Sequence, residues 1–335
     1  MSGGTIMLTR RLAATAAAAG LLYAGSHCRR NAFAQTLAKP VRLMVGFPAG
    51  GGTDVTARIL ADGLRGHYAS TVVVENKAGA GARIAIEHVK NADADGSVLL
   101  FTPDFPMTLY PHSFRSLNYD PLRDFVAVAP TTTSMLGYNV GRAVPESVKT
   151  MPEYVQWCKT NAANAIYATT SAGATPHFTG VMLAREAAIT LAPVHYRGEA
   201  PALQDLLGGH VPASVNPISE ILSLAKSGEL RTLAVTGSRR SPFLPGVPTM
   251  IESGYNVVVE SWLGVFVPAN VPGQIVNALS AAIGEATRSS AMAENLAKFG
   301  SEPTFETPAQ FAMTVKNDLE RWASVVKASG FVADE

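Results

Sequence analysis

Short apolar runs rich in β-branched residues alternate with amphipathic segments along the chain, and this alternation limits the fold more than any other feature. The runs Val41–Phe47, Thr71–Glu75 and Ser97–Thr102 predict buried strands. Helical stripes lie between them, over Val55–Leu64 and Ala80–Lys90. Strands and helices in this order indicate a parallel sheet with helices on both faces.

The same rhythm returns further along the chain, which indicates a second lobe of similar design. Strands and helices are predicted there at Ala165–Thr170, His177–Ile189, Ala192–Tyr196, Pro201–Leu207, Val211–Val215, Ile218–Lys226 and Leu230–Thr236. The long strand-like stretches Phe125–Val140 and Val257–Val267 are interpreted as two crossings between the lobes. Helical patterns at Gly273–Thr287 and Pro308–Ser329 would return to the first lobe.

We therefore expect lobe one at 39–135 plus 256–335, and lobe two at 140–255. A chain of 335 residues with 47% hydrophobic and 16% charged residues is long and apolar enough for two such cores.

The first 34 residues are typical of an export signal. Arg10-Arg11 precedes the apolar stretch Leu12–Gly25, and Ala32-Phe33-Ala34 offers a cleavage site before Gln35. The apolar stretch is too short for a permanent membrane anchor, which is the alternative interpretation. We expect residues 1–34 to be a cleaved signal peptide, of the twin-arginine or the general type, and the mature protein to be periplasmic.

The charge balance of the predicted mature chain argues against nucleic acid as a partner. The segment before Gln35 holds four arginines and no acid, which leaves 23 basic against 26 acidic residues, from totals of 27 and 26. Nucleic-acid binding needs a clustered basic face.

The common signatures of enzymes are missing from the sequence. Gly52 is followed by Thr53-Asp54 and not by the lysine and hydroxyl residue of a phosphate-binding loop. Ile84 replaces the third glycine of a dinucleotide fingerprint, and the histidines lack metal-binding spacing. After cleavage Cys158 is the one remaining cysteine, on a helical pattern where a buried thiol is expected. We expect no catalytic residue, no metal and no cofactor.

Four loops are candidates for ligand binding, because ligands of such sheets collect at the carboxyl ends of strands, near helix N-termini. The loops are Phe47–Asp54, Thr102–Pro106, Thr169–His177 and Asn216-Pro217. Three glycines, Gly50–Gly52, would let the backbone approach a ligand closely. A cation at Arg197, in Tyr196-Arg197-Gly198-Glu199, could also lie near this edge, although a surface arginine on a loop is the commoner case.

Each loop has a purely structural alternative. Gly50–Gly52 could form only a tight strand-to-helix turn, and Asp54 could only cap a helix beginning near Val55. Ser171 and Thr175 could be ordinary N-caps, and His177 a buried structural histidine. A binding role is favoured because all four loops lie at the ends of predicted strands, and these strands belong to both predicted lobes.

Several strings of the sequence, taken together, are specific for one family. They are Val41–Asp54, Val73–Gly81, Tyr119–Phe125, His195–Leu203, Leu206–Gly209, Leu233–Thr236, Pro245–Thr249 and Trp262–Ala269. In these strings, which cover nearly the whole predicted mature chain, the sequence closely resembles the Bug (TctC-like) receptors of tripartite tricarboxylate transporters. The resemblance implies a type II periplasmic-binding-protein fold of the α/β class. Two doubly wound lobes would be joined by two crossover strands, with a ligand cleft between them.

The resemblance further implies a carboxylate held by backbone amides and hydroxyl groups from both lobes. The ligand-binding residues that we expect are Phe47, Pro48, Ala49, Gly50, Gly51, Thr53, Asp54, Thr102, Pro103, Ser171, Ala172, Gly173, Thr175, His177 and Asn216. Many relatives carry aspartate where this chain has Asn216. We hypothesise that the cleft holds one negative charge fewer and prefers a more anionic ligand over an amino acid.

These observations predict a monomeric periplasmic receptor for a small carboxylate, such as a dicarboxylate, a tricarboxylate or a related organic acid. It would deliver its ligand to the membrane permease of a tripartite tricarboxylate transporter or to a sensor. The alternative is an exported α/β enzyme that uses the Gly50–Gly52 loop to bind a small anionic substrate.

Overall fold

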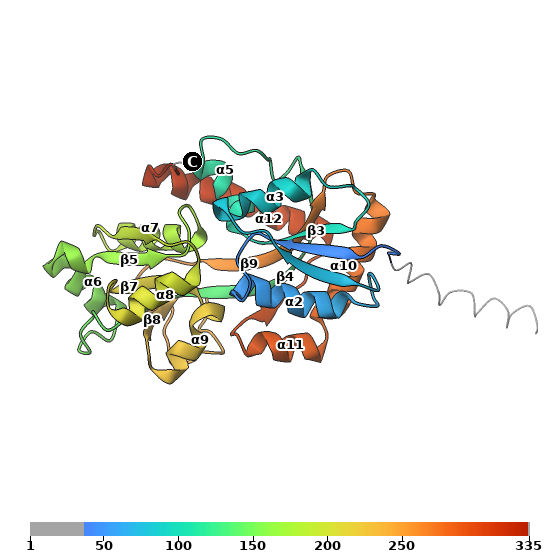
Figure 1. Cartoon of the computed structure of the whole chain (residues 1–335). Helices are drawn as coiled ribbons and strands as arrows, with labels where there is room; N and C mark the ends of the chain where they lie inside the picture. The colour runs from blue at the N-terminus through green and yellow to red at the C-terminus, as the bar shows by residue number, and fades with distance from the viewer. Residues whose placement is uncertain (1–36, 334–335) are drawn as a thin grey trace, which may run out of the picture. The chain divides into compact units, whose positions relative to one another are not determined.

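One long strand belongs to both halves of a curled mixed sheet (Figure 1). The computed structural model describes residues 37–333, so the predicted signal peptide 1–34 lies outside the described residues. The strands run β1 (Val41–Val45), β2 (Val72–Asn76), β3 (Val98–Pro103), β4 (Phe125–Val140), β5 (Ile166–Thr169), β6 (Ala192–His195), β7 (Ala213–Pro217), β8 (Arg231–Val235), β9 (Glu260–Pro268) and β10 (Glu302–Pro303). Their order is β2-β1-β3-β9-β4-β7-β5-β6, with β8 and β10 also paired to β4.

The helices connect these strands in the alternating order that the sequence predicts. They are α2 (Gly52–Leu64), α3 (Arg83–Lys90), α4 (Phe105–Thr108), α5 (Tyr110–Ser113), α6 (Met151–Thr160), α7 (Thr175–Glu186), α8 (Glu199–Gly208), α9 (Ile218–Ser227), α10 (Gly273–Thr287), α11 (Ser290–Ala297) and α12 (Pro308–Ser329). Two short 3₁₀ turns, Ala80–Ala82 and Ala162–Asn164, precede α3 and β5.

The pairing of β4 divides the sheet into two lobes. Its first part, from Phe125 to Met135, pairs antiparallel with β9, which in turn pairs with β3 of the parallel set β2-β1-β3. Its last part, from Leu136 to Val140, pairs antiparallel with β7 and β8, and β7 continues into the parallel set with β5 and β6. The strand β4 therefore runs through both lobes.

Helices cover both faces of the sheet in the first lobe. All six residues of β3 are buried, as expected for a strand enclosed on both sides. One apolar cluster joins β1 and β3 to α2, α10 and α11, and another joins them to α3 and to the first half of α12. In Figure 1 α3 and α12 accordingly lie on one side of the strands, and α2 and α11 on the other.

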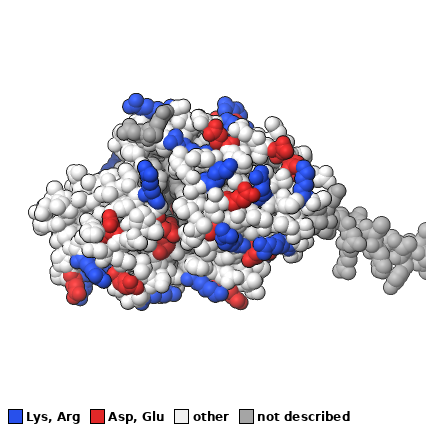
Figure 2. Space-filling model, viewed as in Figure 1, with Lys and Arg blue, Asp and Glu red and all other residues white. Residues whose placement is uncertain are grey.

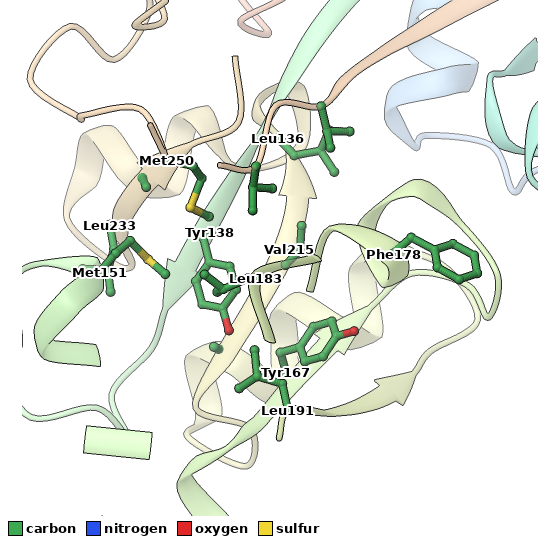
Figure 3. Packing of buried hydrophobic residues seen from close by; sticks show 14 of the residues in the cluster. Leu136, Tyr138, Met151, Tyr167, Phe178, Leu183, Leu191, Val215, Leu233 and Met250 are labelled. Carbon is green, nitrogen blue, oxygen red and sulfur yellow. The ribbon is translucent and has the colours of Figure 1, made fainter. Parts of the chain in front are cut away.

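The second lobe has a core of its own, built around two buried tyrosines. Tyr138 of β4 and Tyr167 of β5 are fully buried among Leu183, Val215 and Met250 (Figure 3). The end of α12 also reaches this core. Trp322 packs against Phe178 of α7 with ring centroids 6.3 Å apart, so α12 ties the two lobes together.

The structure agrees closely with the predicted helices α10 and α12 but differs elsewhere. The helix α2 begins at Gly52, three residues before the expected start, because Gly51 and not Thr53 or Asp54 is its N-cap. The short helices α4 and α5, and α11, were not predicted. The lobe limits 39–135 plus 256–335 and 140–255 stay predictions.

Candidate functional site

A cavity of 410 Å³ lies between the two lobes and is lined by residues from both. The loop from Phe47 to Thr53 forms one wall, and the N-terminal ends of α7, α8 and α9 form the opposite wall. The crossing strands β4 and β9 contribute Thr132, Ser134 and Ser261. The cavity is the size expected for a small organic ligand.

The glycine-rich loop is held from behind by Asp54. Gly50 adopts φ +87°, a backbone conformation that favours glycine, and its N–H donates to Oδ2 of Asp54 at 2.9 Å. Arg58 donates to both carboxylate oxygens at 3.0 Å, and Asn76 Nδ2 donates to Oδ1 at 3.0 Å. Asp54 is 2% exposed, so it positions the loop and does not face the cavity.

The charge of Asp54 is stabilised by these partners. Burial by itself raises the pKa of this carboxyl, but the hydrogen bonds from Arg58, Gly50 and Asn76 together outweigh it, so the pKa lies below its ordinary value. Asp54 therefore stays ionised at neutral pH.

Four helices begin at the cavity, and this makes it a favourable place for an anion. They are α2, α7, α8 and α9, which start at Gly52, Thr175, Glu199 and Ile218. Unpaired backbone N–H groups and the positive end of the helix dipole concentrate at such starts. A ligand carboxylate can accept hydrogen bonds there without any basic side chain.

A buried aspartate connects the lobes beside the cavity. Asp104, directly after β3, is 1% exposed and accepts hydrogen bonds from Thr175 Oγ1 of α7 at 2.8 Å and from Ser261 Oγ of β9 at 2.7 Å. Burial raises its pKa to about 6, although both hydroxyl groups lower it. Thr175 and Ser261 also line the cavity, so Asp104 fixes both of their hydroxyl groups.

Three charged side chains face the cavity itself. Arg197 precedes α8, Glu199 is the first residue of α8, and Glu220 lies in the first turn of α9. The buried Asn216 donates its Nδ2 to Glu220 Oε2 at 3.1 Å. Burial and then the neighbouring Glu199 carboxyl raise the pKa of Glu220 well above its usual range.

The structure brings about half of the expected binding residues to the cavity wall. Those that line it are Phe47, Pro48, Ala49, Gly50, Gly51, Thr53, Pro103 and Thr175. Those that lie outside the lining are Asp54, Thr102, Ser171, Ala172, Gly173, His177 and Asn216. Five of the second group, Asp54, Thr102, Ser171, His177 and Asn216, directly precede or follow a lining residue in the chain.

His177 holds the turn before α7 together. It is 2% exposed, and its Nδ1 accepts a hydrogen bond from the Gly173 N–H at 3.2 Å. Burial, with a smaller effect of His195, lowers its pKa to about 3. His177 is therefore neutral and acts as an acceptor within its own loop, which is the structural alternative that the sequence left open.

Sequence reasoning missed most of the lobe-two wall. Ser219 and Glu220 were not proposed, although they directly follow the predicted strand-end pair Asn216-Pro217. Arg197 was one of two alternatives, a cation near the cleft or a surface arginine; it lines the cavity with an exposed side chain, while Glu199 beside it was not singled out. Ser134 and Ser261 lie on the crossing strands, where we expected no ligand contact.

Charges on the surface are mixed. Figure 2 shows acidic and basic side chains interspersed over the viewed face, without a large area of one sign. Within residues 37–333 no group of histidine, cysteine and acidic residues has a metal-binding arrangement. Likewise, none of the helices in this range is long and apolar enough to cross a bilayer.

Comparison with known proteins shows the family. A family model described as the tripartite tricarboxylate transporter family receptor, TctC, matches residues 56–331. The chain belongs to this family. Members are periplasmic receptors that bind solutes and are not enzymes, so the enzyme alternative is not retained.

Known sequences and solved structures resemble this TctC-family receptor over most of its length. Protein BugT of Bordetella pertussis is 34% identical over 303 residues, which cover 88% of this chain and 90% of that protein. The structure of the periplasmic binding protein BugD is 30% identical with a TM-score of 0.81, covering 88% of this chain and 99% of that one.

Two further structures contain carboxylates. MatC of Rhodopseudomonas palustris, solved with bound malate, is 27% identical, with a TM-score of 0.79, and covers 86% of this receptor and 98% of its own chain. A second R. palustris structure, with adipate, is 28% identical, with a TM-score of 0.83. The match covers 88% of this receptor and 98% of that chain. These likenesses establish the two-lobed periplasmic-binding-protein fold that the sequence predicted.

Proposed function

We propose that this receptor captures a small carboxylate between its lobes in the periplasm and delivers it to the membrane permease of a tripartite tricarboxylate transporter. The observation that carries the proposal is the cavity of 410 Å³, at which four helices begin. The relatives with bound malate and adipate support a carboxylate ligand. Enclosure between lobes strengthens the hydrogen bonds to the ligand by excluding water.

The cellular setting is part of the same proposal. Residues 1–34 would be removed as a signal peptide, and the mature protein would act as a monomer without a cofactor. The N-terminal peptide of the mature protein, measured by mass spectrometry, should begin at Gln35. A protein that keeps residues 1–34 in the periplasmic fraction would contradict this part.

The binding proposal is tested by a thermal-shift screen of the refolded mature receptor. The panel holds carboxylates, with phosphorylated sugars as controls. A ligand at one hundred times its Kd should add about 2.7 kcal/mol to the free energy of unfolding, which raises Tm measurably. Shifts with phosphorylated sugars alone would overturn the proposal.

A variant of the glycine-rich loop ties the shift to the cavity. In Gly51→Val the new side chain enters the cavity wall, where its Cβ would lie 3.4 Å from Glu199 Oε1. We expect this variant to lose the ligand-dependent shift. Gly246→Val is the matched control, because its Cβ meets nothing within 4 Å and Gly246 does not line the cavity. Equal shifts in both variants would place the ligand elsewhere.

A further inference from the structure

A buried carboxyl group lies directly behind two hydroxyl groups of the cavity wall. Asp104 follows β3, is 1% exposed and does not itself line the cavity. Thr175 Oγ1 donates to its Oδ2 at 2.8 Å, and Ser261 Oγ donates to its Oδ1 at 2.7 Å. Because Thr175 and Ser261 both line the cavity, a ligand there meets two hydroxyl groups whose direction depends on Asp104.

Each hydroxyl group has a single proton to donate, and Asp104 receives it in both cases. Within residues 37–333 neither hydroxyl makes another hydrogen bond. A hydroxyl that donates to the carboxylate can offer the cavity only its lone pairs, which accept hydrogen bonds. With Asp104 ionised, this part of the wall therefore cannot donate to a ligand carboxylate.

The charge of Asp104 is not balanced by a cation. None of the ion pairs of 4.0 Å or less in the described part of the chain includes it. On α12, Asp318 and Arg321 pair with each other at 3.0 Å, and their effects on Asp104 oppose one another. On α7, the buried His177 is neutral because its pKa is lowered. A buried carboxyl in such surroundings is costly to ionise.

We propose that a ligand carboxylate binds together with a proton, which Asp104 takes up. The inference rests on the proposed function and concerns how that same cavity holds its carboxylate. The protonated Asp104 still accepts from one hydroxyl group and donates its new proton to the other. The second hydroxyl, of Thr175 or Ser261, is then released to donate to the ligand. The proton comes from solvent, and no covalent bond of the ligand changes. Asp104 is a positioning residue, since it acts through the hydroxyl groups.

The charge of the ligand and the proton favour each other. A carboxylate that accepts from Thr175 or Ser261 is separated from Asp104 by one hydroxyl group, and two carboxylates this close repel each other where water is excluded. Binding therefore raises the pKa of Asp104 beyond its value of about 6 in the free receptor. Affinity is then highest below that pKa and falls as the pH rises above it, by at most about tenfold per pH unit for one proton.

The first test measures proton uptake by the refolded mature receptor. Titration calorimetry at about pH 7.5, in two buffers with different enthalpies of ionisation, gives the number of protons that bind with the ligand. The probes are malate and adipate, the carboxylates in the two R. palustris structures, and any other carboxylate of the panel that raises Tm. Free carboxyl groups titrate at about pH 4–5, so the probes do not themselves take up the proton.

We expect uptake of up to one proton, and a Kd that rises with pH by up to about tenfold between about pH 7 and about pH 8. Binding without proton uptake would overturn the inference and leave the proposed function intact. If no carboxylate binds, the proposed function fails and the inference fails with it.

Asp104→Asn assigns the proton to this residue. Asparagine has an N–H where the protonated carboxyl has an O–H, so it keeps the hydrogen-bond pattern of the protonated form at every pH. The variant should bind without proton uptake, and at about pH 8 it should bind about tenfold tighter than the wild type. A merely structural role predicts weaker binding at every pH. Asp93→Asn, at an exposed aspartate outside the cavity, is the matched control and should behave as the wild type.

Acidic groups on the opposite wall require a second variant. Glu199 and Glu220 also line the cavity, and burial raises the pKa of Glu220 well above its usual range. In Glu220→Gln the proton uptake should remain. Uptake that persists in Asp104→Asn would overturn the inference, and its loss in Glu220→Gln would then assign the proton to the opposite wall.

The two hydroxyl groups are tested without changing the carboxyl. At least one of Thr175→Val and Ser261→Ala should weaken binding of both probes about tenfold, because it removes a charge-assisted hydrogen bond to the ligand. Unchanged affinity in both variants would count against the released hydroxyl and overturn the inference. The Tm of each variant without ligand checks that it has folded.

Discussion

Replacing Asp104 by asparagine isolates the effect of one buried carboxyl on the stability of the receptor. Asp104 is 1% exposed and accepts hydrogen bonds from Thr175 and Ser261. Asparagine has nearly the same shape and stays neutral at every pH. Since hydroxyl groups both donate and accept, one of the two can reverse its role and keep its hydrogen bond to the new amide.

The magnitude follows from the pKa of this carboxyl. Burial raises it to about 6 from an ordinary value of 3.8, so the folded state binds the proton more tightly than the unfolded state. The difference corresponds to about 3 kcal/mol. This stabilisation is fully present below the unfolded pKa of 3.8 and is lost as the pH rises through about 6.

The assay is urea unfolding of the wild type and of Asp104→Asn between about pH 4 and about pH 8. The free energy of unfolding of the wild type, measured relative to the variant, should fall by about 2.4 kcal/mol over this range, because the unfolded carboxyl is already partly ionised at the lower pH. Titration of all other groups cancels in the comparison. Asp93→Asn, at an exposed aspartate, is the matched control. A wild-type advantage that stays constant, or that grows with pH, would refute the reasoning.

Two further predictions concern stability. Trp322→Ala should lower the free energy of unfolding by about 3–5 kcal/mol, because Trp322 is 1% exposed at the contact of α12 with the second lobe. Trp157 is less buried, so Trp157→Ala should lower the free energy of unfolding less in the same urea titration. Thr150→Ala should lower the free energy of unfolding by about 1 kcal/mol, because Thr150 and Glu153 cap α6 reciprocally. The comparison variant is Thr160→Ala, at the other end of α6. A loss of less than a few tenths of a kcal/mol in Thr150→Ala would show that the cap is dispensable.

Long elements with clear ends could be predicted from the sequence. The helices α10 and α12 agree in both bounds with the predicted Gly273–Thr287 and Pro308–Ser329, because apolar periodicity is strong there and α12 opens with a proline. By contrast, α4 and α5 have four residues each and offer no periodicity to detect. The start of α2 was missed because its cap is a glycine without a side-chain hydrogen bond.

The sequence allowed us to predict which loops reach the cavity, but not which of their side chains face it. The loop from Phe47 to Thr53 and Thr175 reach the cavity as expected, since strand ends place them at that edge. Asp54 and His177 belong to the same loops but turn inward and bind their own backbone. Their direction depends on the turn geometry, which residue type alone does not specify. The pairing of Glu199 with Glu220 depends on two helices that only the tertiary fold brings together.

The path of the chain through the sheet affects when the receptor can fold. β3 and the first part of β4 pair with β9, so Val98–Pro103 must wait for Glu260–Pro268 before that edge is complete. The helix α12, which closes both cores, is made last. Contacts between such distant segments form slowly, and a growing chain cannot make them until synthesis is nearly finished. A nascent receptor therefore stays incompletely folded during its synthesis, and its native state becomes accessible only once the C-terminal segment has been released.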